Sequence, residues 1–181
     1  METPDAVHRF WFEEHGSDDW FAGKAAFDAE ITAEFGETHA AVAKGEGWRW
    51  RTDARGRLAE IIVLDQFSRQ LHRGSARAFA QDGMALVLAQ ELVAQGLDTE
   101  LGNDERLFAY LPFMHSESPV VHEEALRLYT ALGNVDALDF EIRHQEVVAR
   151  FGRYPKRNAA LGRPSTPEEV AYLKTVSDRV F

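Results

Sequence analysis

The residues of this chain best suited to gripping an anion form one basic segment, Arg150-Phe-Gly-Arg-Tyr-Pro-Lys-Arg-Asn-Ala-Ala-Leu-Gly-Arg163. The segment holds five cations, Arg150, Arg153, Lys156, Arg157 and Arg163, and no carboxylate. These are five of the chain's 20 Lys and Arg, which leaves 15 elsewhere against 30 Asp and Glu. A guanidinium offers a planar fork of donors that matches a carboxylate or a phosphate. The segment therefore needs either carboxylates from elsewhere in the same fold or an anionic ligand.

A second group of polar residues is expected on the apolar faces of helices. Between Leu58 and His72 apolar residues cover almost the whole circumference of the expected helix, so Asp65 is predicted to be buried. A buried carboxylate must be paired or hydrogen-bonded, and Arg69, one turn later, is the nearest candidate. Three further polar residues are expected on such inward stripes: Asp82 with Phe79 and Leu86, His115 with Phe108 and Leu111, and His144 with Phe140 and Val147. Together these residues favour a ligand site, although a purely structural ion-pair network would use the same side chains.

The elements that must position these residues are predicted to be helices. Apolar residues recur at helical spacing nearly throughout, and no segment shows sustained alternation of period two. Caps, prolines and glycines divide the chain into about eight helices in an antiparallel, all-α array. They are expected at Pro4–Glu14, Lys24–Lys44, Gly56–Leu71, after the Ser75 cap until Gly96, from Asn103 to a bend or end at Pro112, at Pro119–Leu132 and Asp136–Phe151, and after a capping box at Thr166-Pro167-Glu168-Glu169.

Composition limits the classes of function. A chain of 181 residues is expected to form one domain, residues 1–181, with a sizeable core. It has no cysteine, no expected signal peptide and no apolar run long enough to span a bilayer, so a cytoplasmic location is expected. A net charge of −10 argues against binding to nucleic acid or to a membrane surface. No metal-ligand spacing and no cofactor-binding loop is present, so neither a metal nor a cofactor is expected.

Four long motifs occur in a recognisable order: Leu64-Asp-Gln-Phe-Ser-Arg69, Arg77-Ala-Phe-Ala-Gln-Asp82, Leu111-Pro-Phe-Met-His-Ser-Glu117 and Arg150-Phe-Gly-Arg-Tyr-Pro-Lys-Arg-Asn158. With these motifs the chain resembles the bacterial family called domain of unknown function 924 over nearly its whole length. The resemblance implies a helical fold of the tetratricopeptide-like kind and no established activity. The family's motif residues fall here on Asp65, Gln66, Arg69, Asp82, His115, Ser116, Glu117, His144, Arg153, Arg157, Asn158 and Arg163.

Three functions use these residues differently. The first hypothesis is a protein that binds a small anionic molecule or a carboxylate-bearing peptide end. Arg153, Arg157 and Arg69 would grip the anion, and Asp65 and Asp82 would orient the arginines from behind. Neutral hydrogen bonds would come from Gln66 and Asn158, with His115 and Glu117 lining the same pocket.

The second hypothesis is a hydrolase or transferase in which His115 is a general acid and base, oriented by Glu117 or Asp65. The third is a protein–protein interaction scaffold whose charged residues only hold the helices together. Asp65, Arg69, His115 and the Arg153–Arg157 loop are predicted to share one neighbourhood, because each lies on or directly follows an inward-facing stripe. The sequence does not fix the oligomeric state.

Overall fold

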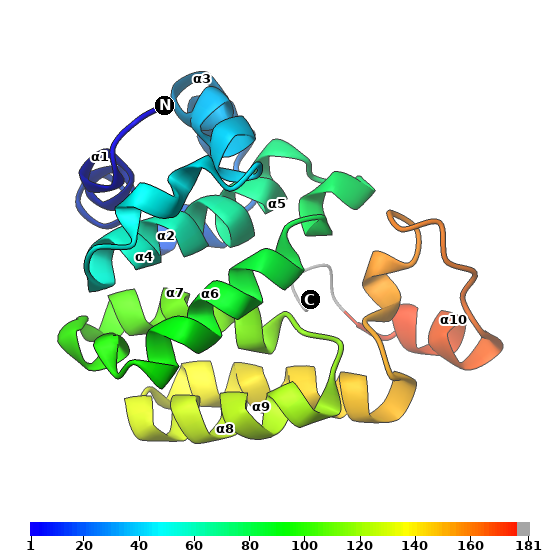
Figure 1. The fold of residues 1–181 in the computed structure, drawn as a ribbon. Coiled ribbons are helices and arrows are strands. Elements are labelled where there is room, and N and C mark those ends of the chain that lie inside the picture. Colours follow the sequence, from blue (N-terminus) through cyan, green and yellow to red (C-terminus); the bar gives the residue numbers. More distant parts are fainter. Residues whose placement is uncertain (177–181) are drawn as a thin grey trace. The chain divides into compact units, whose positions relative to one another are not determined.

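The computed structural model of the chain describes residues 1–176, and every regular element in that range is a helix. The expected all-α class is therefore confirmed (Figure 1). The chain divides into two compact units. The first comprises Met1–Arg73 and Arg77–Pro112, and the second comprises Gly74–Ala76 and Phe113–Phe181. The expectation of a single domain stays a prediction.

The first unit is built from short and medium helices, several of which run on into one another. In chain order they are α1 (Pro4–Arg9), π-helix η1 (Phe10–Glu14), α2 (Ser17–Trp20), α3 (Ala25–Val42), 3-10 helix η2 (Glu46–Trp50), α4 (Ala54–Ile62), π-helix η3 (Val63–Phe67), α5 (Ser68–Leu71), 3-10 helix η4 (Ala76–Phe79), α6 (Asp82–Ala94), 3-10 helix η5 (Leu97–Glu100) and α7 (Asn103–Met114). The first residue of η4 and the last two residues of α7 belong to the second unit. The α4 helix packs against α1 and α6, and α3 packs against α5.

The core of the first unit is rich in aromatic rings. Trp11 is fully buried, with its ring centroid 5.3 Å from that of Phe108 and 5.6 Å from that of Phe67. The Trp20 indole stacks on Trp11 and donates a hydrogen bond of 2.8 Å to the Trp11 carbonyl. These contacts fix η1 against the helix that carries Asp65, because Phe67 lies two residues after it in η3.

The second unit contains a long antiparallel pair, α8 (Pro119–Leu132) and α9 (Val135–Phe151), followed by the short 3-10 helix η6 (Pro155–Arg157) and by α10 (Pro167–Leu173). Pro119 begins α8 at its first position, and Asn134 caps α9 with its side chain. Gly152 ends α9 in the left-handed region, at φ +68°, where glycine carries no Cβ penalty. The chain can therefore turn sharply at the start of the basic segment.

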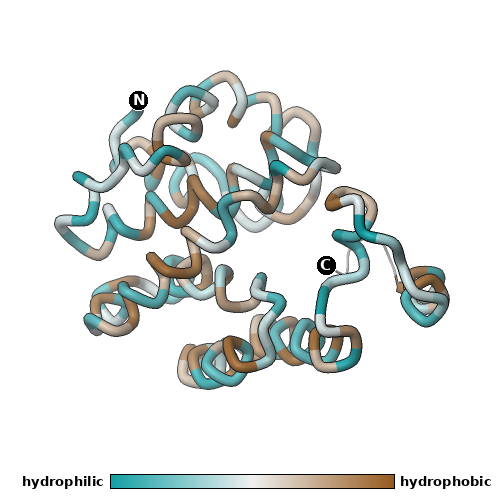
Figure 2. Tube along the Cα trace, turned by 45° about the vertical axis from the view of Figure 1, so that its right-hand side comes forward, coloured by the Kyte–Doolittle hydropathy of each residue, from teal (hydrophilic) through white to brown (hydrophobic). Residues whose placement is uncertain are grey.

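Hydrophobic and hydrophilic residues alternate along these helices at short intervals (Figure 2), as expected when each helix buries one face. On α9 the buried face consists of Ala137, Glu141, His144, Val147 and Val148. Phe140, which the helical pattern placed on this face, is 46% exposed. The buried face is thus rotated by about one residue from the expected one, and it contains Glu141 instead.

Most predicted helices are confirmed. The helices that begin at Pro4, Pro119 and Pro167 start where the sequence places them, and Thr166 and Glu169 form the predicted capping box. One start is wrong. Ser75 does not open the fourth helix, because η4 and a turn come first and α6 begins at Asp82. Pro112 lies inside α7, which ends two residues later.

Candidate functional site

The structure places Asp65, Gln66, Arg69 and Asp82 together in the first unit. We call this group the Asp65 cluster. Asp65 lies in η3, a π-helical turn between α4 and α5. Such turns inside α-helices frequently mark functional sites, because the extra residue changes which side chains face one another. The turn falls on the Leu-Asp-Gln-Phe motif, which a uniform helical pattern does not reveal.

Both oxygens of Asp65 are engaged within this cluster. Its Oδ1 lies 3.0 Å from Nη1 of Arg69, and its Oδ2 accepts a hydrogen bond of 2.6 Å from Nε2 of Gln66. Only 1% of Asp65 is exposed, so its predicted burial and its pairing with Arg69 are confirmed. Arg69 also donates to both oxygens of Asp82, at 3.0 and 3.2 Å. Asp82 was expected to be buried, but it is 20% exposed because it begins α6 rather than lying within the helix.

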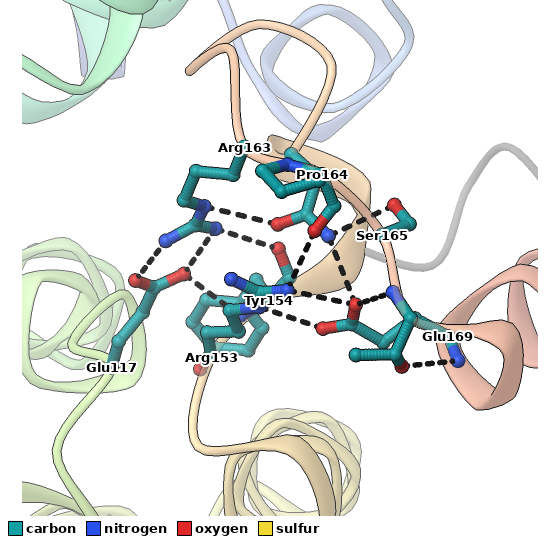
Figure 3. Close-up of polar contacts among 9 residues, drawn as sticks. Glu117, Arg153, Tyr154, Arg163, Pro164, Ser165 and Glu169 are labelled. Carbon is teal, nitrogen blue, oxygen red and sulfur yellow. Dashed lines mark hydrogen bonds and ion pairs between the residues drawn. The ribbon is translucent and has the colours of Figure 1, made fainter.

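In the second unit the basic segment meets carboxylates of the same unit (Figure 3). Arg163 donates to both oxygens of Glu117, at 2.7 and 2.9 Å, to the Tyr154 carbonyl at 3.1 Å and to Oδ1 of Asn158 at 3.0 Å. The Tyr154 backbone N–H donates to the same Glu117 carboxylate at 2.8 Å. Glu117 therefore ties both Tyr154 and Arg163 of the segment to the turn between α7 and α8.

Arg153 forms the other half of this arrangement. It donates to both oxygens of Glu169, at 2.7 and 2.9 Å, and to the Pro164 carbonyl at 2.9 Å. Glu169 also accepts from the Thr166 backbone N–H at 2.7 Å as part of the capping box of α10. The hydrogen bonds from Arg153 and Thr166 lower the pKa of Glu169 from 4.5 to about 2. At the edge of the segment Arg150 pairs with Glu168 at 2.8 Å, with both side chains more than half exposed.

Glu117 is held ionised by its contacts. Burial alone raises the pKa of Glu117, but the hydrogen bonds from Arg163 and the Tyr154 N–H, with the charges of Arg163 and Arg157, lower it below its ordinary value. A carboxylate gripped in this way is poorly suited to exchanging protons at neutral pH. Glu117 is better explained as the acceptor that organises the segment.

A third group surrounds the buried ring of Tyr154. We call Arg157, His115, His144 and Tyr154 the Arg157 site. The Arg157 guanidinium lies over the Tyr154 ring, 4.6 Å from its centroid, and donates to the His115 carbonyl at 2.9 Å. The His144 ring stands nearly perpendicular to the Tyr154 ring, 5.6 Å away. Three motifs that are distant in sequence thus meet at one aromatic side chain.

His144 is electrically neutral in this setting. Its Nδ1 donates a hydrogen bond of 2.7 Å to the Phe140 carbonyl, so this nitrogen carries the proton. Burial lowers the pKa of His144 well below 6.5, against the effect of that bond, and nearby basic groups, Arg157 among them, lower it further. His144 is therefore an uncharged member of the Arg157 site.

The remaining motif residues shape the turns between these groups. The Ser116 hydroxyl accepts from the Ser118 N–H at 3.2 Å, and the Ser116 carbonyl accepts from His122 at 2.9 Å. Asn158 donates to the Ser165 hydroxyl at 3.0 Å. Both residues are thus explained by local hydrogen bonds that order the chain around the Arg157 site.

Several residues of these groups escape sequence reasoning. Tyr154, His122, Glu141 and Glu169 are all buried. Glu169 could have been found, since it is the last residue of the predicted capping box. To predict Glu141 and His122, the buried face of α9 and its packing against α8 would have to be known. The prediction that Asp65 and Arg69 share a neighbourhood with the basic segment stays a prediction, because the two groups belong to different units.

Two kinds of feature are absent from residues 1–176. No group of three or more His, Cys, Asp or Glu side chains in this range is arranged to hold a metal ion. None of the helices in the same range has an apolar stretch long enough to cross a membrane.

Comparison with known proteins identifies the family. Residues 7–177 match the family model described as bacterial protein of unknown function, DUF924. A solved structure of a protein of unknown function from Agrobacterium tumefaciens is 38% identical, with a TM-score of 0.91 over 96% of this chain and 97% of that one. No curated protein matches the chain. The chain belongs to the family of bacterial proteins of unknown function DUF924.

Proposed function

We propose that the second unit binds a small anionic ligand, or the carboxylate end of a peptide, at the Arg157 site. The observation that carries the proposal is the meeting of Arg157, His144 and the His115 segment around Tyr154. The Arg157 guanidinium is positioned by the face of the Tyr154 ring and by the His115 carbonyl. A ligand carboxylate or phosphate would be attracted by the positive charge of Arg157.

The proposal assigns different tasks to the arginines of the basic segment. Arg153 and Arg163 each direct a fork of donors at a carboxylate of the second unit, so they hold the segment in shape. Arg157 would bind the ligand, and the segment ordered by Arg153 and Arg163 would hold it in position. His144, whose Nδ1 donates to the Phe140 carbonyl, would line the ligand site as an uncharged ring.

Inorganic phosphate and acetate are suitable first probes, because they represent the two kinds of anion that a guanidinium fork matches. A bound anion stabilises the native state by mass action, by about 2.7 kcal/mol at 100 times its dissociation constant. We expect phosphate or acetate to raise the melting temperature by several degrees at saturation. Arg157→Gln should remove that rise, because it replaces the charge with a neutral polar side chain.

The matched control is Arg150→Gln, which removes a cation from the same segment where the pair with Glu168 is exposed. We expect this variant to keep the full anion-induced rise. An equal loss in both variants would indicate a general charge effect and would contradict the site. No rise with either anion in the unmodified chain would contradict the proposal outright.

A second candidate function is a scaffold for a partner protein. It is favoured by the forks between Arg163 and Glu117 and between Arg153 and Glu169, which are typical of a structural ion-pair network. On this view Arg157→Gln lowers stability as much as Arg153→Gln and changes no anion response. The enzyme hypothesis, with His115 as general acid and base, stays a prediction.

A further inference from the structure

A fully buried glutamate and a fully buried histidine face each other between α8 and α9, and neither belongs to the proposed ligand contacts. Nδ1 of His122 lies 2.6 Å from Oε1 of Glu141, and neither side chain is exposed at all. A single proton lies between these two atoms. It belongs either to the histidine, giving an ion pair, or to the glutamic acid, giving a neutral pair.

The other nitrogen of His122 has a fixed role. Its Nε2 lies 2.9 Å from the Ser116 carbonyl, which can only accept, so Nε2 carries a proton. The Tyr154 hydroxyl lies 3.1 Å from the same nitrogen, but it donates its own proton to the Met114 carbonyl at 2.6 Å. Nε2 is thus a donor whichever form the pair takes, and the only open question concerns Nδ1.

The surroundings of Glu141 decide that question. Its second oxygen, Oε2, is buried and has no hydrogen-bond partner among residues 1–176. In an ionised carboxylate this oxygen would carry negative charge with no donor, whereas in a protonated acid it is only a carbonyl oxygen. A buried ion pair is stable only when further hydrogen bonds satisfy its remaining atoms, and here one atom is unsatisfied.

The titratable groups that face the pair add no carboxylate-stabilising contact. Tyr154, in the basic segment, donates its hydroxyl proton to the Met114 carbonyl and not to Glu141. His144, three residues after Glu141 on α9, is itself neutral, so it offers the Glu141 carboxyl no positive charge. Burial also raises the pKa of Glu141, more than the bond with His122 lowers it.

We infer that Glu141 is protonated at neutral pH and donates to His122, so that a neutral pair positions the turn of residues 114–117. The turn is held at two carbonyls, by His122 at Ser116 and by Tyr154 at Met114. The same turn supplies the carbonyl of His115 to Arg157. Glu141 is therefore a positioning residue for the Arg157 site, a consequence that rests on the proposed function, whereas the location of the proton does not.

The location of the proton can be measured in the unmodified full-length chain. Long-range proton–nitrogen spectra of the ¹⁵N-labelled protein at pH 7 distinguish a neutral Nε2–H tautomer from an imidazolium. The His122 signals can be assigned through their contact with the Tyr154 ring. We expect one protonated and one unprotonated nitrogen. Two protonated nitrogens would overturn the inference.

Substitution of Glu141 provides an independent measurement. Glu141→Gln keeps the shape and places an N–H where the acid proton is inferred to be, so the melting temperature should change by no more than about 2 °C. Glu141→Ala leaves Nδ1 of His122 buried without a donor and should lower the melting temperature by about 10 °C. A loss in Glu141→Gln as large as that in Glu141→Ala would overturn the inference, because it would mean that the charge is required.

Phosphate titration separates this inference from the proposed function. If phosphate binds the unmodified chain, Glu141→Gln should keep its dissociation constant within about twofold, since the turn is still held. If phosphate fails to bind while His122 shows the neutral tautomer, the proposed function fails and the neutral pair stands. If phosphate binds and His122 is an imidazolium, the site stands and the neutral pair fails.

Discussion

Glu117 and Arg163, 46 residues apart, meet through two parallel hydrogen bonds of 2.7 and 2.9 Å. The two side chains are 27% and 23% exposed, which puts the pair between a surface and a buried ion pair. The contact joins the turn before α8 to the far end of the basic segment. It explains how an excess of cations is tolerated in a loop that contains no carboxylate of its own.

Breaking this contact should destabilise the second unit measurably. Glu117→Gln removes the charge that Arg163 meets and weakens the acceptor of the Tyr154 N–H, so we expect a loss of about 2 kcal/mol in the free energy of unfolding. Chemical denaturation measures it. Glu168→Gln is the control, because its pair with Arg150 is exposed and should contribute less than about 0.5 kcal/mol. Equal losses in the two variants would show that burial of Glu117 is unimportant.

Asp65→Asn should be more severe than Asp82→Asn, although both change a partner of Arg69. Asp65 is fully buried, and its replacement leaves Gln66 and Arg69 facing an amide instead of a charge, at a cost of about 3 kcal/mol. Asp82 is partly exposed, so water can compensate and the loss should be about 1 kcal/mol. Denaturant titrations of the two variants make the comparison. A loss below about 1 kcal/mol for Asp65→Asn would contradict its role.

His39 should make the first unit less stable in mild acid. Its Nε2 donates to the Ser68 hydroxyl, which in turn donates to the Leu64 carbonyl. Burial, followed by the charges of His72 and Arg77, lowers the pKa of His39 from 6.5 to about 4. Between pH 6.5 and about pH 4, His39 is protonated in the unfolded chain but not in the folded chain. Stability is therefore unaffected above pH 6.5 and falls as the pH drops towards 4, by up to about 1.4 kcal/mol per unit.

The contribution of His39 is isolated by His39→Gln, which can still donate to Ser68 but does not titrate. We expect the variant to lose stability less steeply than the unmodified chain between pH 6.5 and 4. Parallel curves for the two proteins over this range would show that His39 is accessible to protons in the folded state.

Glu169 should protect the start of α10 against hydrogen exchange. Its carboxylate accepts from the Thr166 N–H and from Arg153, and with a pKa of about 2 it stays ionised in the folded state throughout mild acid. The stabilisation is thus fully present above pH 4.5, declines as the pH falls below 4.5 and is lost by about pH 2. Glu169→Gln should speed exchange of the Thr166 amide at pH 7, as measured by mass spectrometry. Glu168→Gln, next to it but exposed, should leave this amide unchanged.

The parts of the fold that could be predicted are those with local causes. Pro4, Pro119 and the Thr166 capping box predict helix starts, because proline at the first position and a capping box each favour the first turn of a helix. The burial of Asp65 is predictable because apolar residues cover almost the whole circumference of its helix. The failures have non-local causes. The start of α6 at Asp82 depends on a preceding 3-10 turn, and the exposure of Phe140 depends on how α9 rotates against α8.

The candidate site divides in the same way. The sequence identified the basic segment and its motif neighbours as unusual, because charge and composition are visible without a structure. It could not identify Glu117 and Glu169 as the counter-ions of Arg163 and Arg153, since those pairs form only after the chain has folded back on itself. For the same reason the pair of His122 and Glu141 could not be predicted, because the two residues meet only when α8 packs against α9.

The placement of the tryptophans makes the two units optically distinguishable. All four, Trp11, Trp20, Trp48 and Trp50, belong to the first unit, whereas Tyr129, Tyr154 and Tyr172 belong to the second. Indole emission during unfolding therefore follows only the first unit, while far-ultraviolet circular dichroism follows the helices of both. Coincident transitions of the two signals would mean that the chain unfolds cooperatively as one domain. A dichroism change with no accompanying change in emission would mean that α8, α9 and α10 melt on their own.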